Sequence, residues 1–323
     1  MFALRKVSCL TLSFVPERYT DFGRLTPSAA ITATLQRFKN FAHYNILFSF
    51  FQYILAIFFN LLTIFRFYTI IIAYLYEGKY MKQLLKDGFS ELGIDIKDET
   101  LEKLIKYADL LKIWNEKMNL TAVIDDFGIA TKHFLDSATP ILTGLVNGRV
   151  IDVGTGAGFP GMVLKILKPE LDITLLDSLK KRLVFLEEVA KELDIDVNLV
   201  HMRAEDAGRQ MRGKFDTAVS RAVANMSVLS EFCLPLIKEG GSFLALKGPL
   251  AQNELDNAKR AIHILGGDIL PTFSVPIPET DLNHKIILIK KVRQTPISYP
   301  RKAGIVTKNP LGTCYNPKKK PTK

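Results

Sequence analysis

Apolar positions between residues 81 and 147 recur every three or four residues, which predicts helices that bury one face. The first helix is expected to end near Gly93, and the second to be capped by Asp98 or Thr100. A third helix is expected over roughly residues 127–145. The positions that define the first two helices are Leu84, Leu85, Phe89 and Leu92, then Leu101, Leu104, Ile105, Ala108, Leu111 and Met118. Residues 81–147 are therefore predicted to form a small helical domain.

After residue 148, short runs of β-branched and other apolar residues alternate with helical patterns. The predicted strands are residues 150–153, 173–176, 197–202, 215–220 and 242–246, followed by a terminal pair at 269–277 and 285–290. Strands that alternate with helices form a parallel sheet that helices cover. The pattern predicts an α/β fold with a mostly parallel, seven-stranded sheet over residues 148–295.

Residues 1–80 differ from the rest of the chain in composition. Residues 44–65 contain no charged side chain, and a second apolar run follows Arg66. Such a segment is long enough to cross a bilayer, but it begins too far from the N-terminus for an ordinary signal peptide. From Met81 on, the sequence is charged and amphipathic. We therefore expect Met81 to be the natural start and residues 1–80 to be a hydrophobic extension outside the native protein; a genuine membrane anchor is the alternative.

The net charge of +10 is unevenly distributed along the chain. The C-terminal tail, residues 296–323, contains seven Lys or Arg side chains and no acidic residue. Such a tail indicates either a polyanionic partner such as nucleic acid or a solvated, disordered end. The three cysteines, Cys9, Cys233 and Cys314, form neither a metal-binding spacing nor a disulfide framework, which fits a reducing cytoplasm.

The most informative stretch is RVIDVGTGAGFPG, residues 149–161, where a predicted strand leads through four glycines into a helix. Gly156, Gly158 and Gly161 match the dinucleotide fingerprint G-x-G-x-x-G. Asp152 and the next three alternate glycines also match D-x-G-x-G-x-G, the pattern of S-adenosylmethionine (SAM) methyltransferases. Because the two patterns overlap on the same residues, the glycines alone do not decide between the two ligands.

Three side chains follow predicted strands at the edge where open α/β sheets bind ligands. Asp177 ends the second strand, 23 positions after Gly154, near the spacing of an acid that accepts hydrogen bonds from ribose hydroxyls; the alternative is a helix cap, although Ser178 can also serve there. Arg221 ends the fourth strand and suits a carboxylate or a phosphate, or a surface ion pair. Lys247 ends the fifth and is placed to face an RNA backbone.

Seven motifs in order resemble the glucose-inhibited division protein B family, the rRNA small subunit methyltransferases G. They are KIWNEKMNLTAV, KHFLDS, IDVGTGAGFPG, LLDSLKKR, AED, SRAVA and LKG, and the tail motif YPRKAGIVTKNPL is also similar. The resemblance runs from about Met81 to Leu311. It implies a cytoplasmic, class I SAM-dependent methyltransferase with a Rossmann-like fold. Its implied substrate is N7 of a guanine in 16S rRNA, at the position that the family calls guanine 527, in the RNA or the small ribosomal subunit.

The resemblance also implies the site residues. Expected cofactor contacts are Gly154, Gly156, Gly158, Phe159, Asp177, Ser178, Ala204, Glu205 and Arg221. Ala204 and Glu205 are expected in a loop after the third strand. No metal is implied. Guanine N7 carries a free lone pair, so methyl transfer to it needs no general base. His133, Arg221 and Lys247 are the possible catalytic residues, although His133, near Asp136, is expected to be structural or an RNA contact before a base.

RNA contacts are expected from the helical domain, from Lys132 and Lys247, and from the tail through Arg301 and Lys302, with Asn119 and Thr121 either contacting RNA or capping a segment. Two other functions stay open from the residues alone. One is a nicotinamide-dependent oxidoreductase that uses the dinucleotide fingerprint. The other is a non-catalytic RNA-binding or membrane-tethered protein with a SAM-like fold.

Overall fold

The computed structural model describes residues 53–54, 56–59, 61, 63–66, 79–248 and 251–312. The chain divides into two compact units, Met1–Ala73 and Tyr74–Lys323. In the first unit the described residues are helical, and their large apolar side chains are exposed. Over the described part of the chain, no helix combines the length and the hydropathy that crossing a bilayer requires. Most of the predicted hydrophobic segment, and tail lysines 318–320 and 323, lie outside the described residues.

The predicted helices between residues 81 and 147 are present, with different ends. The first is helical over residues 79–91 and is followed by Gly93 in a left-handed conformation. Helix α2 (Asp98–Met118) has Lys97 at its N-cap, so the predicted cap at Asp98 or Thr100 is wrong. Asp98 instead lies in the first turn, where a negative charge favours the helix dipole. The division into a helical domain, a methyltransferase domain and a tail stays a prediction.

The predicted third helix is a series of short helical turns. It consists of α3 (Asp126–Gly128), the π-helix η1 (Ile129–Leu135), α4 (Asp136–Ala138) and the 3₁₀ helix η2 (Thr139–Thr143). The wide turn η1 contains His133, and its residues other than Lys132 are buried. Single π-turns occur frequently at functional sites because they redirect side chains.

The second unit contains a mixed sheet in the order β3-β2-β1-β4-β5-β8-β6, with β7 also paired to β8. The first five strands are parallel and β8 is antiparallel to its neighbours. Their bounds are β1 (Arg149–Val153), β2 (Asp172–Asp177), β3 (Asn198–His201), β4 (Phe215–Arg221), β5 (Ile237–Lys247), β6 (Gly267–Ile269), β7 (Phe273–Pro276) and β8 (Asn283–Lys291). The mostly parallel α/β sheet is thus confirmed.

Two strands differ from the sequence-based expectation. The predicted strand 269–277 is two strands, β6 and β7, which gives eight strands in place of seven. Pro271 lies in the break, and proline has no N–H to donate to a sheet. The predicted strand 242–246 begins earlier in the structure, because Gly240 and Gly241 also lie inside β5, where the register to β4 shifts. A Cβ at Gly241 would lie 2.5 Å from the carbonyl oxygen of Asp216, so the strands approach closely there.

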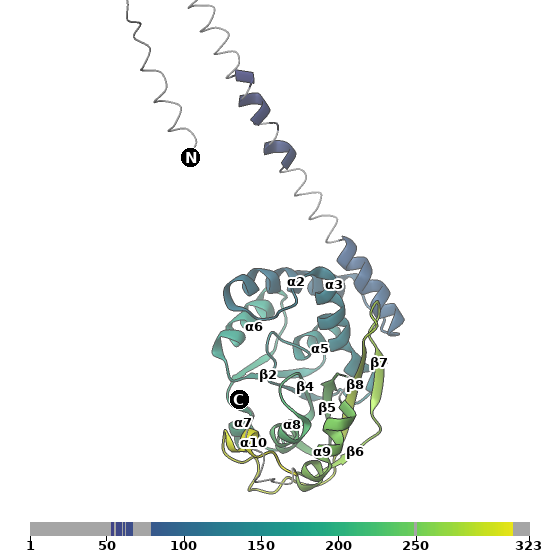
Figure 1. The fold of residues 1–323 in the computed structure, drawn as a ribbon, viewed down its shortest axis with the longest axis vertical. Helices are drawn as coiled ribbons and strands as arrows, with labels where there is room; N and C mark the ends of the chain where they lie inside the picture. The colour runs from purple at the N-terminus through teal and green to yellow at the C-terminus, as the bar shows by residue number, and fades with distance from the viewer. Residues whose placement is uncertain are drawn as a thin grey trace, which may run out of the picture. The chain divides into compact units, whose positions relative to one another are not determined.

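Successive residues of the strands pack into two separate hydrophobic layers, because side chains alternate across a sheet. Val150 packs with α2, α5 (Gly161–Leu167) and α6 (Lys180–Glu192), whereas Ile151 packs with the helices of the opposite face. Those are α7 (Ala204–Gln210), α8 (Met226–Cys233), η3 (Leu234–Leu236), α9 (Ala251–Ile264) and α10 (Ile305–Lys308). Figure 1 shows the sheet between these two sets of helices. The arrangement leaves the carboxyl ends of the parallel strands for a ligand.

Candidate active site

A cavity of about 730 Å³ lies where β1, β2 and β4 end. Its volume is in the range of small-molecule sites, roughly 300–1,000 Å³. It brings together most of the predicted cofactor residues: Gly154, Gly156, Phe159, Asp177, Ser178, Ala204, Glu205 and Arg221, together with His133 and Thr121. Gly158 lies beside the cavity and does not line it. Most of the residues predicted from the sequence therefore lie around one cavity.

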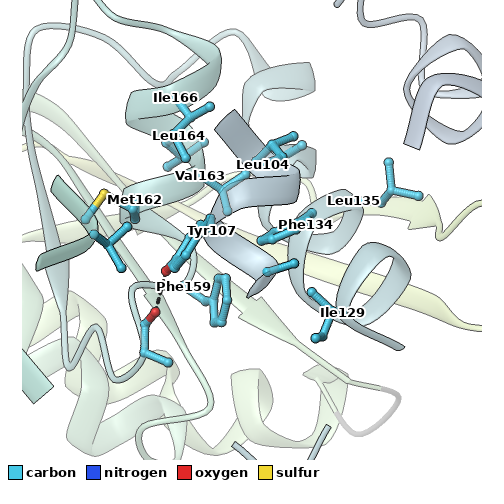
Figure 2. Close-up of a cluster of buried hydrophobic side chains, with 14 of the residues drawn as sticks. Leu104, Tyr107, Ile129, Phe134, Leu135, Phe159, Met162, Val163, Leu164 and Ile166 are labelled. Carbon is cyan, nitrogen blue, oxygen red and sulfur yellow. Dashed lines mark hydrogen bonds between the residues drawn. The ribbon is translucent and has the colours of Figure 1, made fainter. Parts of the chain in front are cut away.

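The glycine-rich loop after β1 turns through left-handed conformations that favour glycine. Gly156 has φ +63° and nothing closer than 4.0 Å to a built Cβ, so its backbone borders open space. Gly158 is glycine for a different reason, because the Tyr107 hydroxyl of α2 occupies the place of its Cβ. That hydroxyl donates to the Ala157 carbonyl, as Figure 2 shows. Helix α2 thus braces the loop, a role that the motif did not reveal for Tyr107.

Asp152 holds the loop from inside. Its Oδ2 accepts hydrogen bonds from the Thr155 hydroxyl at 2.7 Å and from the Gly161 amide at 2.9 Å. The side chain is fully buried, and Oδ1 has no hydrogen-bond partner among the described residues. Burial raises the pKa of this carboxyl to about 6, although the two donors oppose the shift. The first acid of the motif is therefore structural, since it ties both ends of the loop together.

Asp177 is buried at the end of β2 and already accepts three hydrogen bonds. Oδ1 accepts from the Leu179 amide at 2.8 Å, and Oδ2 accepts from the Gly156 amide at 3.0 Å and from Arg182 Nη1 at 3.2 Å. A carboxylate has about four acceptor positions, so one remains for a ribose hydroxyl. A second bond requires Arg182, whose side chain is 35% exposed, to move away. Asp177 thus also shapes the start of α6, where Leu179 is the N-cap in place of Ser178.

Ala204 and Glu205 form the first turn of α7, so the prediction of a loop here is wrong. Acidic residues favour the positive end of a helix, which explains why the charged stretch after Arg203 is helical. Glu205 lines the cavity and is only 5% exposed, yet it has no hydrogen-bond partner within the part of the chain that the structure describes. Its carboxylate oxygens are not among the described buried atoms that lack a partner, so they reach the open space of the cavity. They can accept hydrogen bonds from a ligand with N–H or O–H groups, as the adenosine and amino acid parts of SAM have.

Phe159 connects the glycine loop to η1. Its ring stacks on the His133 ring, with centroids 4.5 Å apart, and the Arg221 guanidinium lies 5.2 Å from its centroid. Figure 2 shows Phe159 beside Tyr107 and Phe134, in the cluster that joins α2 and η1 to the loop. Phe159 thus forms part of the cavity through a packed, preorganised ring.

The His133 imidazole is engaged on both nitrogens. Arg221 Nη2 donates to Nδ1 at 3.3 Å, so Nε2 carries the proton and donates to the Thr121 hydroxyl at 2.8 Å. Burial and then the Arg221 charge lower the pKa of His133 to about 4. The ring is therefore neutral at pH 7, and its lone pair is already used. This geometry supports a positioning role over proton transfer.

Arg221 is held by groups that the spacing analysis did not bring together. Nη1 donates to Asp136 Oδ2 at 2.7 Å and to the Lys132 carbonyl at 2.6 Å. Asp136 Oδ1 in turn binds His284 Nδ1 of β8 at 2.6 Å. This hydrogen bond raises the pKa of His284. Burial alone would raise the pKa of Asp136, but the bonds from His284 and Arg221 outweigh it and lower that pKa. No sequence pattern identifies His284, because only the fold brings it next to Asp136.

A second hollow of about 570 Å³ adjoins the first. Both are lined by His133, Arg221, Ala222 and Val223, and the second also contains Asp136, Lys247, Glu254 and His284. The two hollows therefore share a boundary formed by the end of β4 and η1.

Two basic residues expected to contact RNA are engaged within the protein. Lys247 is 8% exposed, donates to the Ala224 carbonyl and pairs with Glu254 at 2.8 Å, so it does not present a free charge. Arg301 binds the fully buried Glu231 through Nε and Nη2, at 2.9 and 2.7 Å. Both expectations need correction, because nearby buried carboxylates attract these cations inward. Lys132, Lys302 and Asn119 are exposed, and Asn119 ends α2.

Comparison with known proteins identifies the family. The sequence model of the rRNA small subunit methyltransferase G family matches residues 100–277. The protein of that name from Alkaliphilus oremlandii is 50% identical over 236 residues, which cover 72% of this chain and 99% of that protein. The Clostridium kluyveri protein is 50% identical over 226 residues, 68% and 94% of the two chains. The solved structure of TrmN from Thermus thermophilus covers 50% of this chain at 17% identity, but its TM-score of 0.40 does not bear on the family.

The family model covers the glycine loop, the helix α2 that braces it, and the strands that carry Asp177 and Arg221. The chain belongs to the rRNA small subunit methyltransferase G family of SAM-dependent rRNA methyltransferases.

Proposed function

We propose that this enzyme transfers a methyl group from SAM to N7 of a guanine in the 16S rRNA of the small ribosomal subunit. The observation that carries this proposal is the pair of adjoining hollows whose shared boundary contains no imidazole with a free lone pair among the described residues. A nucleophile that must lose a proton needs a base within reach. Guanine N7 has no proton to lose, so it suits this boundary.

In this proposal the first cavity binds SAM, which supplies an activated methyl group. The backbone around Gly156 leaves room for the amino acid part, and Asp177 accepts from a ribose hydroxyl. Glu205 and Ala204 lie at the end of the cavity that follows β3, where the adenosine part is expected. The residues present fit this group, because the buried Glu205 carboxylate gains a donor and the glycine turn leaves space.

We further propose that the second hollow binds the target base. Guanine presents the acceptors N7 and O6 on one edge and N–H donors on its Watson–Crick edge. The hollow offers the Arg221 guanidinium, the His284 imidazole, whose pKa the hydrogen bond to Asp136 raises, and the carboxylate of Glu254, whose Oε2 binds Lys247. With N7 directed at the shared boundary, the donor edge of the base faces away from SAM, toward this carboxylate.

The protein then contributes orientation and electrostatics. Displacement at the methyl carbon requires the attacking nitrogen in line, at roughly 3–3.5 Å, and the stacked Phe159 and His133 rings keep the boundary rigid. The guanine ring becomes cationic as the methyl group arrives. The carboxylates of Asp136 and Glu254 line the second hollow and are paired with Arg221 and Lys247, so they offset the positive charge that these two side chains would otherwise place beside that cation.

The base must leave its helix or loop to enter. In A-form RNA the major groove, which contains N7, is too deep and narrow for side chains, so enzymes that modify such bases extrude them. The exposed Lys132 and Lys302 are our candidates for phosphate contacts. A ribosomal substrate also supports the cytoplasmic location expected from the sequence.

A substituted RNA tests the choice of N7. Small ribosomal subunits are reconstituted with 16S rRNA that contains 7-deazaguanosine in place of guanosine. Each substituted base then differs from guanine only by a carbon in place of N7. We expect wild-type enzyme and labelled SAM to methylate the control subunits and to leave the substituted ones unlabelled, while both bind the enzyme equally. Equal labelling of the two would refute N7 as the acceptor, and labelling of N1 or N2 would show which edge reacts.

A further inference from the structure

The part of the tail that the structure describes folds back on the enzyme and does not extend from it. Arg209 of α7 donates to the Pro300 carbonyl at 3.1 Å, and Arg212 donates to the Thr295 carbonyl at 3.0 Å and also to the Tyr299 carbonyl. A Cβ on Gly208 would lie 2.8 Å from the Pro300 ring, so the tail packs directly against α7. Figure 1 shows α10 beside α8.

A buried ion pair fixes the next turn of the tail. Glu231 of α8 is fully buried, and it accepts from the Arg301 backbone amide at 2.8 Å as well as from the guanidinium. A buried carboxylate is stable only with such partners. Three residues later Gly304, with φ +81°, is the N-cap of α10, and Val306 inserts into the core shared with α8. The backbone path of residues 299–308 is therefore specified by α7 and α8.

The opposite side of this turn faces the cofactor cavity. Ala303, Gly304 and Thr307 line it, on the same cavity that Ala204, Glu205 and Phe232 line. Phe232 follows Glu231 in sequence, and Glu205 lies on the helix that packs against Pro300. The tail thus closes the end of the cavity formed by α7 and α8.

We propose that the turn formed by residues 303–307 is a binding wall for the adenosine part of the cofactor, and that Ala303, Gly304 and Thr307 set the affinity for it. The inference rests on the placement of SAM in this cavity proposed above. The wall suits a flat, partly apolar ring, because two of its three residues have small or no side chains and leave the adjacent space open. In this proposal the described part of the basic tail mainly binds the cofactor. Only its side chains that face outward are available to contact RNA.

Two neighbouring substitutions on α10 test the wall. Thr307 and Lys308 are both exposed, but only Thr307 lines the cavity. We expect Thr307→Trp to fill the adenosine end and weaken binding of S-adenosylhomocysteine at least tenfold by calorimetry on the full chain without RNA. Lys308→Trp, of the same size and one residue away, is expected to bind within twofold of wild type. Both variants are expected to unfold at the wild-type temperature in the absence of ligand.

A fragment of the cofactor shows which end of the cavity a substitution affects. Methylthioadenosine, which has the adenosine and lacks the amino acid, is expected to lose affinity for Thr307→Trp by the same factor as S-adenosylhomocysteine. Wild-type binding of either ligand by Thr307→Trp would overturn the proposal, and so would an equal loss in Lys308→Trp. Because no RNA is present, these results stay informative even if the guanine assignment fails.

Discussion

At the scale of one residue, the protonation of His133 is the consequence of the site geometry that can be tested most directly. Its pKa is lowered to about 4 from the ordinary value of 6.5, by burial and by the Arg221 charge. Between these pH values the unfolded chain binds a proton that the folded protein does not. Stability is therefore lost as the pH falls from 6.5 toward 4, by on the order of 3 kcal/mol at most.

We predict that NMR titration of the His133 ring will show no protonation down to about pH 5. His201, which lies on the surface at the end of β3, serves as an internal comparison in the same spectra. A midpoint for His133 near 6.5 would contradict the assigned hydrogen bonds, and it would restore this residue as a candidate base.

Asp152 titrates in the opposite sense. Its pKa is raised to about 6, so its contribution to stability is fully present below the ordinary value of 3.8 and is lost as the pH rises through 6.

Asn in place of Asp152 keeps an oxygen that accepts from Thr155 and Gly161, whereas Ala removes both hydrogen bonds. At neutral pH we predict that Asp152→Ala is less stable than Asp152→Asn by about 1–3 kcal/mol in urea unfolding. Asp152→Asn should also retain S-adenosylhomocysteine binding; equal stability of the two variants would show that the loop does not depend on these bonds.

At the scale of elements, the tail provides the sharpest prediction. Arg301→Glu places a second carboxylate against the buried Glu231, which costs about 3–5 kcal/mol. For a chain of this size we expect the unfolding temperature to fall by on the order of 10 °C. Lys302→Glu, at an exposed neighbouring position, is expected to leave that temperature unchanged and to weaken RNA binding. If Arg301→Glu unfolds like wild type in a thermal scan, the tail is not anchored as described.

The elements that sequence patterns predicted best are those whose apolar residues decide them locally. Val150 and Ile151 are buried on both faces of β1, and the period of Leu101, Leu104 and Ala108 follows one face of α2. The patterns were less informative where tertiary contacts override local preference. Pro271 divides a predicted strand, β5 begins before the predicted residue 242, and the charged residues after Arg203 start a helix.

The candidate site shows the same division. The glycine loop and Asp177 were predictable because their chemistry depends on sequence spacing within one strand–turn–helix unit. His284 was not predictable, since it reaches Asp136 from a strand 148 positions away. Lys247 and Arg301 were misjudged for a related reason, because the carboxylates that hold them, Glu254 and Glu231, lie on other helices. Charge in a sequence indicates a partner, but only the fold shows whether that partner lies within the protein.

At the scale of the whole molecule, the unit Tyr74–Lys323 contains both hollows and every site residue discussed above. Met81 is 2% exposed, packed in the core that continues into α2. We predict that a protein starting at Met81 is soluble and binds S-adenosylhomocysteine like the full chain. Activity confined to full-length protein extracted from membranes would contradict this and would favour the anchor.

The measurement that tests the account most directly uses that shorter protein with unmodified small ribosomal subunits and labelled SAM. The RNA is then digested and its nucleosides are resolved by mass spectrometry. The account predicts label in 7-methylguanosine alone, at one position of 16S rRNA, and predicts that Asp177→Ala lowers the yield by weakening cofactor binding. Label in any other nucleoside, or in 7-methylguanosine at many positions, would contradict the proposed pairing of the two hollows.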